Sequence, residues 1–357
     1  MYIIAGIYFI YLNFLIILSK KYSNKIVSSL YIIFFIILNF YLSSYISDYS
    51  RDFSNYSDWF DQIYYSGFWE NITGKDPGFK TLVSFIQLFL GNNYAYIYFI
   101  YMMLIFFFKY KFSREVFSGI SLLIFFWIVF CSTFVLYEIT QIRVGLAIAF
   151  ASYIIIISIY NKPSFWTWSL LLLSYFFHQS ISILLICYLV LIIFNKQLIN
   201  RFFIIGMLLL GLFVNVFFQD KLSDFIGFYL MSNERAENYL NGVENLSKIS
   251  LFSFFFLSKI IIIAFLLFYW EFLSKAKRAI VFLSALGCFF YMVFMFNGVF
   301  AVRVSELFIL FSLACFVFPL ELKVINKDLK YLWLFILFIL GGVFLYSSSK
   351  ILLDYAI

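Results

Sequence analysis

The chain is poor in charged residues. Only 12% of its 357 residues are Asp, Glu, Lys or Arg, against about 25% in ordinary globular proteins, while 65% are apolar. A helix that is apolar on all sides needs lipid or a very large interior around it. The shortage of charge therefore excludes water-soluble enzyme folds and nucleic-acid-binding proteins, and it predicts an all-α polytopic membrane protein embedded in a lipid bilayer.

Histidine and cysteine are also scarce. The chain has one histidine and four cysteines, and it contains no HExxH motif. The cysteines lie inside apolar runs without paired spacing, which is typical of small core residues and indicates no disulfide framework. These counts argue against a His/Cys zinc site, although the carboxylates leave a divalent-ion site open. We predict no cofactor and no bound metal.

Twelve apolar runs have spanning or near-spanning length, and they lie at 2–18, 26–44, 93–108, 116–136, 142–160, 164–177, 179–194, 202–218, 251–270, 279–297, 302–318 and 331–349. The stretch 164–194 could form one helix of about 46 Å or two of about 21 Å. We predict two, because a single helix would move the basic residues of the second half to the outer side, against the positive-inside rule.

Twelve crossings with both termini outside place most basic residues on one face. That face collects fifteen of the 25 basic residues, Lys109 among them, and four of the 18 acidic ones. The positive-inside rule makes this face cytoplasmic. The sequence therefore predicts one integral membrane domain over residues 1–357, with about 12 transmembrane helices and with the N- and C-termini outside.

Two predicted outer loops are long, at 45–92 and 219–250, whereas every predicted cytoplasmic connection is short. Within the first loop, Asp76-Pro77-Gly78 interrupts the chain. The apolar segment 79–91 that follows is too short to span, so we expect a short interfacial or re-entrant helix there. The long loops indicate that the functional side faces outward.

Charged residues at the ends of predicted spans need an explanation, because a charge in a bilayer costs a few kcal/mol. Glu138, Gln141 and Arg143 lie at the outer mouth between the fourth and fifth spans. Arg303 is expected to open the eleventh span, with Glu306 one turn later. A helix N-terminus disfavours cations, so an arginine there favours an anionic ligand such as phosphate. The alternative is that Arg143 pairs with Glu138, and Arg303 with Glu306.

Other polar residues are candidates on weaker grounds. His178 lies between the two short helices, and it could be a general base, a hydrogen-bond donor to substrate or a cap for the turn. Carboxylates and aromatic rings alternate in the first outer loop, which suits a sugar-binding surface but also an interfacial aromatic belt. Asp52 and Tyr56 are the candidates there. Arg235 and Tyr239 in the second loop are candidates beside the alternative of a solvated helix face.

Taken in order, several short motifs resemble the EpsG family of Wzy-like bacterial polysaccharide polymerases. They are Asp52-Phe53-Ser54-Asn55-Tyr56, Asp76-Pro77-Gly78-Phe79, Gln141-Ile142-Arg143 with Ala147 one turn below, Phe177-His178-Gln179-Ser180, and Arg303 in a late span. The resemblance implies an enzyme that joins oligosaccharide repeat units carried on undecaprenyl diphosphate at the outer face of the bacterial cytoplasmic (inner) membrane. A chain-length regulator and a flippase are the candidate protein partners.

The mechanism we expect is a single displacement with inversion at the anomeric carbon of the donor glycan. Arg143 and Arg303 hold the departing diphosphate, whose charge develops in the transition state. The proton of the acceptor hydroxyl goes to Glu138, His178 or Asp52, with His178 and Glu138 preferred. The expected substrate-binding residues are Asp52, Tyr56, Gln141, Arg235 and Tyr239.

Three other functions are alternatives. An O-antigen-ligase-type transferase would use similar chemistry with another acceptor. A flippase or transporter of lipid-linked oligosaccharides would need polar residues on both sides of the midplane, whereas the predicted cytoplasmic half is nearly uncharged. A membrane acyltransferase would usually carry an early His and Arg pair near a cytoplasmic mouth, whereas the one histidine of this chain is midway along it.

Overall fold

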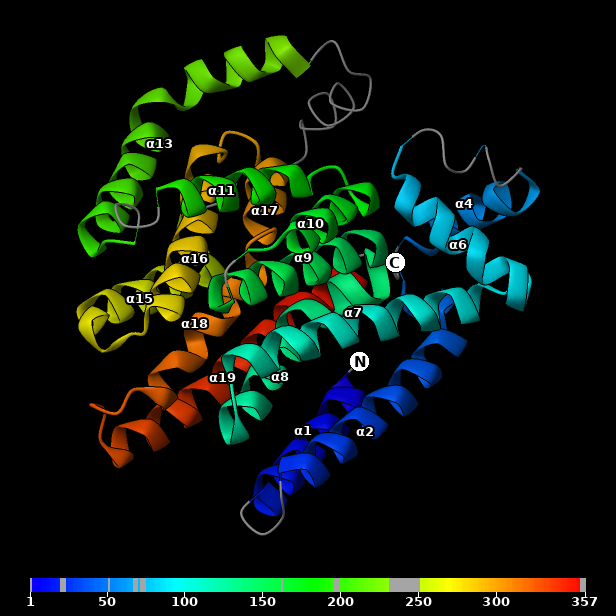
Figure 1. The fold of residues 1–357 in the computed structure, drawn as a ribbon, viewed down its shortest axis with the longest axis horizontal. Helices are drawn as coiled ribbons and strands as arrows, with labels where there is room; N and C mark the ends of the chain where they lie inside the picture. Colours follow the sequence, from blue (N-terminus) through cyan, green and yellow to red (C-terminus); the bar gives the residue numbers. More distant parts are fainter. Residues whose placement is uncertain are drawn as a thin grey trace. The chain divides into compact units, whose positions relative to one another are not determined.

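The computed structural model describes residues 2–19, 24–50, 52–66, 70, 75–161, 163–194, 199–230 and 251–353. Throughout these ranges the regular elements are helices (Figure 1). The chain forms two compact units. Unit 1 comprises residues 1–182 and 325–357, and unit 2 comprises residues 183–324.

Unit 1 is built around two long helices, α7 (Tyr94–Val116) and α9 (Ile142–Tyr160), which pack along each other. Between them in sequence, α8 (Gly119–Thr133) continues directly into a π-helical segment, η1 (Phe134–Thr140), and packs against α1 and α19. The other helices of this unit are α1 (Tyr2–Ser19), α2 (Asn24–Ser44), α3 (Ile46–Tyr49), α4 (Phe53–Tyr65), α6 (Pro77–Leu90), α10 (Phe165–Phe177) and α19 (Lys327–Leu353).

Unit 2 is organised around α16 (Lys275–Val293), which packs against α13, α15, α17 and α18. Gly287 makes one of these contacts possible, because a Cβ there would lie 2.9 Å from the Cβ of Phe308. The other elements are α11 (Ile181–Ile193), whose first two residues belong to unit 1, α13 (Arg201–Leu230), α15 (Phe254–Phe268), the 3-10 turn η3 (Trp270–Phe272), α17 (Gly298–Glu306) and α18 (Ile309–Glu321).

Seven helices in the described ranges are long and apolar enough to cross a membrane, and an eighth span results if α17 and α18, bent by 63°, count as one. Five shorter apolar helices accompany them. Four of these five, in α1, α10, α11 and α15, match the remaining predicted spans, and the fifth is α6. The chain is therefore an all-helical, multi-pass protein. The number of twelve crossings and the side of the termini stay predictions.

Details of the expected organisation differ from the structure. Residues 164–194 form two helices, as expected, with the break at residues 178–180. The second outer loop does not begin at residue 219, because α13 continues as a helix to Leu230; residues 231–250 lie outside the described ranges. Lys109 is not at a solvent-facing helix end. Lys109 is only 2% exposed, and its ammonium group donates a hydrogen bond to the carboxylate of Glu138 inside unit 1.

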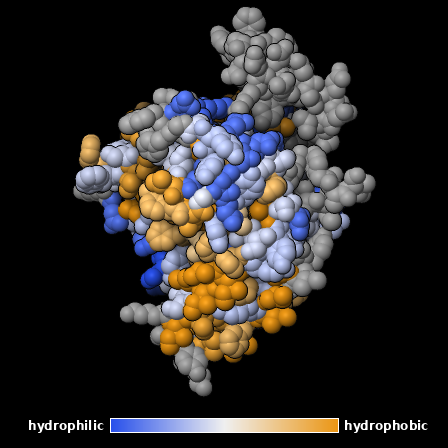
Figure 2. Space-filling view, turned by 90° about the vertical axis from the view of Figure 1, so that its right-hand side faces the viewer, coloured by the Kyte–Doolittle hydropathy of each residue, from blue (hydrophilic) through white to orange (hydrophobic). Residues whose placement is uncertain are grey.

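The short helix α6 is apolar on two faces. Phe79, Val83 and Ile86 are buried against the protein, whereas Phe85 and Phe89 are exposed. Figure 2 shows the right-hand side of the view in Figure 1, where hydrophilic residues gather in the upper half of the surface and hydrophobic residues in the lower half. An exposed apolar face on a helix too short to span is consistent with a helix at the membrane interface.

Candidate functional site

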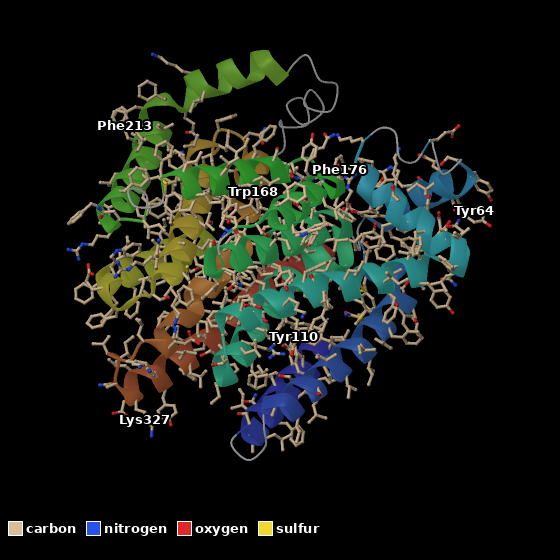
Figure 3. All side chains as sticks on the ribbon, in the orientation of Figure 1. Tyr64, Tyr110, Trp168, Phe176, Phe213 and Lys327 are labelled. Atoms are coloured by element: carbon tan, nitrogen blue, oxygen red, sulfur yellow. The ribbon has the colours of Figure 1, made fainter. Side chains whose placement is uncertain are left out.

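The first element of the candidate site is Asp76, the residue before α6. Its backbone is left-handed, with φ 52° and ψ 56°, and its residue is 1% exposed. Pro77 occupies the first helical position, which needs no N–H donor. Gly78 then approaches α10 closely, since a Cβ there would lie 3.0 Å from the carbonyl carbon of Phe176, labelled in Figure 3. Each residue of the Asp-Pro-Gly motif thus has a distinct structural role.

Arg143 is the second element, and it lies in the first turn of α9 as expected. Its Nη1 donates to Oδ2 of Asp76 at 2.6 Å, with the arginine side chain 16% and the aspartate side chain 1% exposed. The guanidinium lies over the Trp59 ring at 4.8 Å and the Phe79 ring at 5.7 Å. The Asp76 carboxylate and the two aromatic rings therefore fix the orientation of the Arg143 guanidinium plane.

The connection after α10 is the third element. The backbone N–H of Gln179 donates to Oδ1 of Asp76 at 3.3 Å, so the two carboxylate oxygens engage two different partners. His178 is the C-cap of α10, in an extended conformation and partly buried. The structure thus brings Asp76, Arg143 and the His178-Gln179 segment together, although they are separated by 36 to 103 residues in the sequence.

Tyr56 of α4 and Asp52, the residue before this helix, are the candidates from the first outer loop. Tyr56 is 4% exposed and packs against Trp59, Phe79 and Tyr98. Burial raises the pKa of Tyr56 to about 12, opposed by the nearby charge of Arg143. Its hydroxyl is therefore neutral at physiological pH, and Tyr56 supports the site from behind. Asp52 is the N-cap of α4 but its side chain makes no capping bond.

Gln141 marks the junction between η1 and α9. Its backbone N–H donates to the carbonyl of Leu136 at 2.6 Å, and its carbonyl accepts from Gly145 at 2.9 Å. A Cβ on Gly145 would lie 2.7 Å from the carbonyl oxygen of Tyr137, so glycine allows η1 and α9 to touch. The close η1–α9 contact fixes the start of α9, which carries Arg143.

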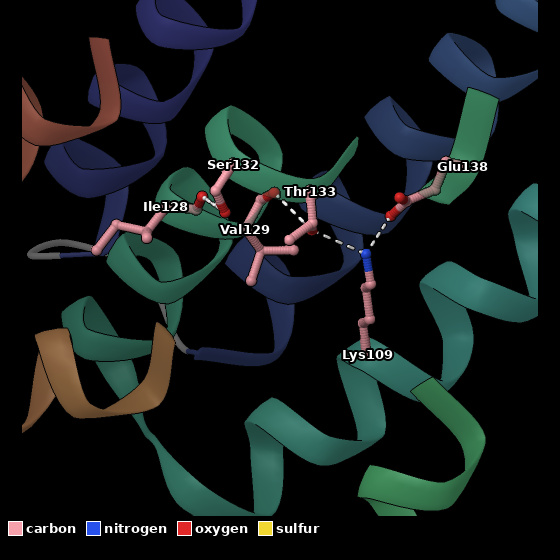
Figure 4. A network of polar contacts seen from close by, with 6 residues as sticks. All are labelled: Lys109, Ile128, Val129, Ser132, Thr133 and Glu138. Atoms are coloured by element: carbon pink, nitrogen blue, oxygen red, sulfur yellow. Dashed lines mark hydrogen bonds and ion pairs between the residues drawn. The ribbon is translucent and has the colours of Figure 1, made fainter. Parts of the chain in front are cut away.

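A second ion pair lies inside the helices of unit 1. Nζ of Lys109 donates to Oε1 of Glu138 at 2.7 Å and to the hydroxyl of Thr133 at 3.1 Å, with side chains 3% and 4% exposed for the lysine and the glutamate (Figure 4). The alternative pairing of Arg143 with Glu138 is therefore wrong. The packing of the helices determines both pairs. The start of α6 places Asp76 next to Arg143, and α7 places Lys109 next to Glu138.

Unit 2 corrects the expectation for Arg303. Asn297 caps α17 by accepting from the N–H groups of Val299 and Phe300, so α17 begins at Gly298. Arg303 is exposed and lies in the last turn of this nine-residue helix, where a cation is favoured by the helix dipole. The argument that a helix N-terminus makes Arg303 an anion site is therefore wrong, and the candidate depends on its sequence motif alone.

Some candidates remain untested and others were missed. Arg235 and Tyr239 lie outside the described residues. Within the described ranges, no three His, Cys, Asp or Glu side chains gather where they could hold a metal ion. In the sequence, Asp76 marked a chain break and belonged to one of the motifs that carry the family resemblance, but it was not predicted as a site residue. Sequence reasoning also assigned Lys109 to a helix end, because Lys111 and Arg114 follow closely.

Comparison with known proteins gives one match. Residues 40–355 match the family model described as the EpsG family. No curated protein and no solved structure matches the chain. The matched region contains the complete site of Asp76, Arg143 and His178-Gln179.

Proposed function

Because the chain belongs to the EpsG family, we propose that it is a polymerase that joins oligosaccharide repeat units carried on undecaprenyl diphosphate. Family membership indicates a polysaccharide-polymerase-type function in a multi-pass membrane protein. The proposal adds the lipid-linked donor, the location at the outer face of the bacterial inner membrane, and the residues that act.

The observation that supports this proposal most directly is the geometry of Arg143. Asp76 engages only Nη1, and Nε is a buried atom without a hydrogen-bond partner among the described residues, so the accessible part of the side chain lies elsewhere. Its side chain is 16% exposed, so part of the guanidinium is accessible from outside the protein. A fixed, partly accessible guanidinium at a helix N-terminus suits a phosphate oxygen, because its donors are already oriented. In the proposal, Asp76 is the positioning residue and Arg143 binds the diphosphate leaving group.

The proposed proton acceptor is His178. It adjoins Gln179, whose N–H contacts Asp76, so the histidine belongs to the same cluster as Arg143. Glu138 was the other preferred base, but its Oε1 is held by Lys109 in a buried pair. We therefore assign Glu138 a positioning role at the junction that leads to Arg143. Arg303 stays a candidate for diphosphate binding from its sequence motif, and it is tested by a separate variant.

The test is a polymerisation assay with purified protein in phospholipid nanodiscs, supplied with an undecaprenyl-diphosphate-linked repeat unit and no membrane gradient. Longer glycans are expected from the wild type. Arg143→Lys retains the positive charge but not the planar set of guanidinium N–H donors, so the polymerisation rate should fall by about 100-fold or more. His178→Ala and Arg303→Lys are assayed in parallel. Near-normal product from Arg143→Lys would contradict the leaving-group role.

The same assay separates the rival functions. A flippase moves its substrate without lengthening it, so unchanged glycans, together with transbilayer movement of the labelled lipid in sealed vesicles, would replace the polymerase proposal. A ligase-type transferase would lengthen no repeat unit but would transfer the glycan to a different acceptor lipid. Product mass therefore identifies the polymerase and, once a second acceptor lipid is supplied, the ligase-type transferase, whereas movement of the labelled lipid identifies the flippase.

A further inference from the structure

Unit 1 also contains a groove, separate from the Arg143 site, at the end of α2 and the start of α7. It is an open groove of about 450 Å³, bounded by the end of α2, α3, the start of α4 and the segment that joins α6 to α7. Its volume lies within the range of about 300–1,000 Å³ typical of small-molecule sites. None of its ten lining residues carries a formal charge, in contrast to the site at Arg143.

The polar side chains of the groove are held in place from behind. Asn92 donates to Oδ1 of Asp61 at 2.5 Å and accepts from Nε2 of Gln87 at 2.8 Å. The hydroxyl of Tyr94 donates to the same aspartate oxygen at 2.7 Å, and Gln87, 5% exposed, also donates to the carbonyl of Phe60 at 2.8 Å. Asp61 and Gln87 thus fix the rotamers of Asn92 and Tyr94, as in a preorganised binding site.

These bonds determine what the groove offers to a ligand. The proton of Tyr94 goes to Asp61, so its phenolic oxygen is left as an acceptor. The side-chain oxygen of Asn93 accepts from the N–H of Ala95 at 3.0 Å, which leaves its amide nitrogen as a donor. The hydroxyls of Ser43 and Ser44 donate to the carbonyl of Phe40, so their oxygens also accept. The groove therefore offers neutral groups only, with the hydroxyl oxygens of Tyr94, Ser43 and Ser44 as acceptors and the amide nitrogen of Asn93 as a donor.

We propose that this groove binds an uncharged sugar residue of the glycan. A sugar hydroxyl can both donate and accept, so it can donate to the hydroxyl oxygens and accept from the Asn93 amide, and the ring of Phe53 in the wall can cover an apolar sugar face. A phosphate would find no cation among the lining residues. The inference rests on the proposed function for its biological role, but the ligand class follows from the groove itself.

The groove and the Arg143 site are connected through α4 and α6. Gln87 of α6 contacts Phe60 of α4, the ring of Phe60 lies 6.3 Å from that of Phe79, and Phe79 lies under the guanidinium of Arg143. One packed pair of helices therefore supports both the groove and the Arg143 site. In the proposal, Arg143 holds a substrate by its phosphates, and the groove holds a glycan by one of its sugars.

The test measures sugar binding to the full chain in phosphatidylcholine nanodiscs, since maltoside detergents would occupy the groove. Lactose, maltose and chitobiose are the probes, followed by saturation-transfer NMR. Ser44 and Ser47 are exposed lining residues, so Ser44→Trp or Ser47→Trp fills the groove from its rim. We expect at least one disaccharide to bind the wild type, and we expect its affinity for either variant to be lower by about tenfold or more.

The matched control is Tyr45→Trp, which adds bulk at an exposed neighbour that does not line the groove. It should leave disaccharide binding unchanged. Inorganic diphosphate is a second probe, and its binding should be unaffected by Ser44→Trp but weakened by Arg143→Lys. A further experiment uses nanodiscs that contain monogalactosyl diacylglycerol. If the bound sugar belongs to a lipid, this glycolipid should compete with the free disaccharide.

Two results would overturn the inference: no disaccharide binds the wild type, or binding is equal in the wild type and in both folded tryptophan variants. Neither result bears on the polymerase proposal, which fails instead if Arg143→Lys polymerises at the normal rate. Weak disaccharide binding to the tryptophan variants, with normal diphosphate binding, would establish the groove as a separate neutral subsite.

Discussion

The two ion pairs of unit 1 have nearly the same length but different surroundings. Arg143 and Asp76 are 2.6 Å apart and Lys109 and Glu138 are 2.7 Å apart. The first pair is built on a loop and a helix start, and its arginine side chain is 16% exposed, whereas both side chains of the second are below 5%. Exposure of one partner leaves donors for a ligand. A sealed pair is not accessible to a ligand, so its role is to fix the helices that surround the open pair.

The largest expected effect is on stability, from breaking the sealed pair. Lys109→Met leaves the Glu138 carboxylate buried without its cation, which should cost about 3–5 kcal/mol of folding free energy. The double variant Lys109→Met/Glu138→Gln removes both charges and should recover most of that loss. Thermal unfolding of the protein in nanodiscs measures both. A double variant as unstable as the single one would show that the charge pair itself holds η1 in place.

The next effect is on activity, from the open pair. Asp76→Asn keeps the shape of the side chain but removes the charge that orients Arg143, so the guanidinium loses its fixed plane. We expect a loss of about 10-fold to 100-fold in polymerisation rate with little change in thermal stability, since misplacement of a binding group lowers the rate sharply. Rates and melting temperatures are measured on the same preparation. Equal rates for Asp76→Asn and wild type would remove the positioning role.

The comparison also shows what sequence can and cannot predict. Apolar run lengths predicted the helices, including the break between α10 and α11, because burial in lipid imposes a simple rule. Pairings such as Asp76 with Arg143 were not predicted, because they join residues 67 apart and depend on how helices pack. Lys109 was misassigned for a related reason. A lysine near other basic residues looks like a membrane-flanking charge, and only the fold reveals a buried carboxylate beside it.

A smaller effect is expected from the close contact between Gly78 of α6 and the backbone of Phe176 in α10, which lies next to the Asp76–Arg143 pair. Gly78→Ala places a Cβ about 3.0 Å from the backbone of Phe176, so α6 and α10 must separate by a few tenths of an ångström. We expect roughly tenfold lower activity and about 1–2 kcal/mol less stability. Gly342→Ala in α19 is the control, because a Cβ there meets nothing within 4 Å. If both alanine variants behave alike, the Gly78 contact does not shape the site.

The smallest effect at neutral pH is expected for Tyr56→Phe. Because burial raises the pKa of Tyr56 to about 12 from an ordinary value near 10, the group is neutral in both folded and unfolded chains below pH 10. The neutral hydroxyl therefore contributes its full share to the free energy of unfolding below pH 10. This contribution is lost as pH rises from 10 to 12, because the tyrosine ionises first in the unfolded chain. Activity at pH 7 should change less than about twofold, since the hydroxyl is buried. Unfolding measured from pH 9 to 12 should show wild type losing stability relative to Tyr56→Phe. Parallel curves over that range would mean that the hydroxyl ionises as readily in the folded chain as in water, and that Tyr56 is open to solvent beside Arg143.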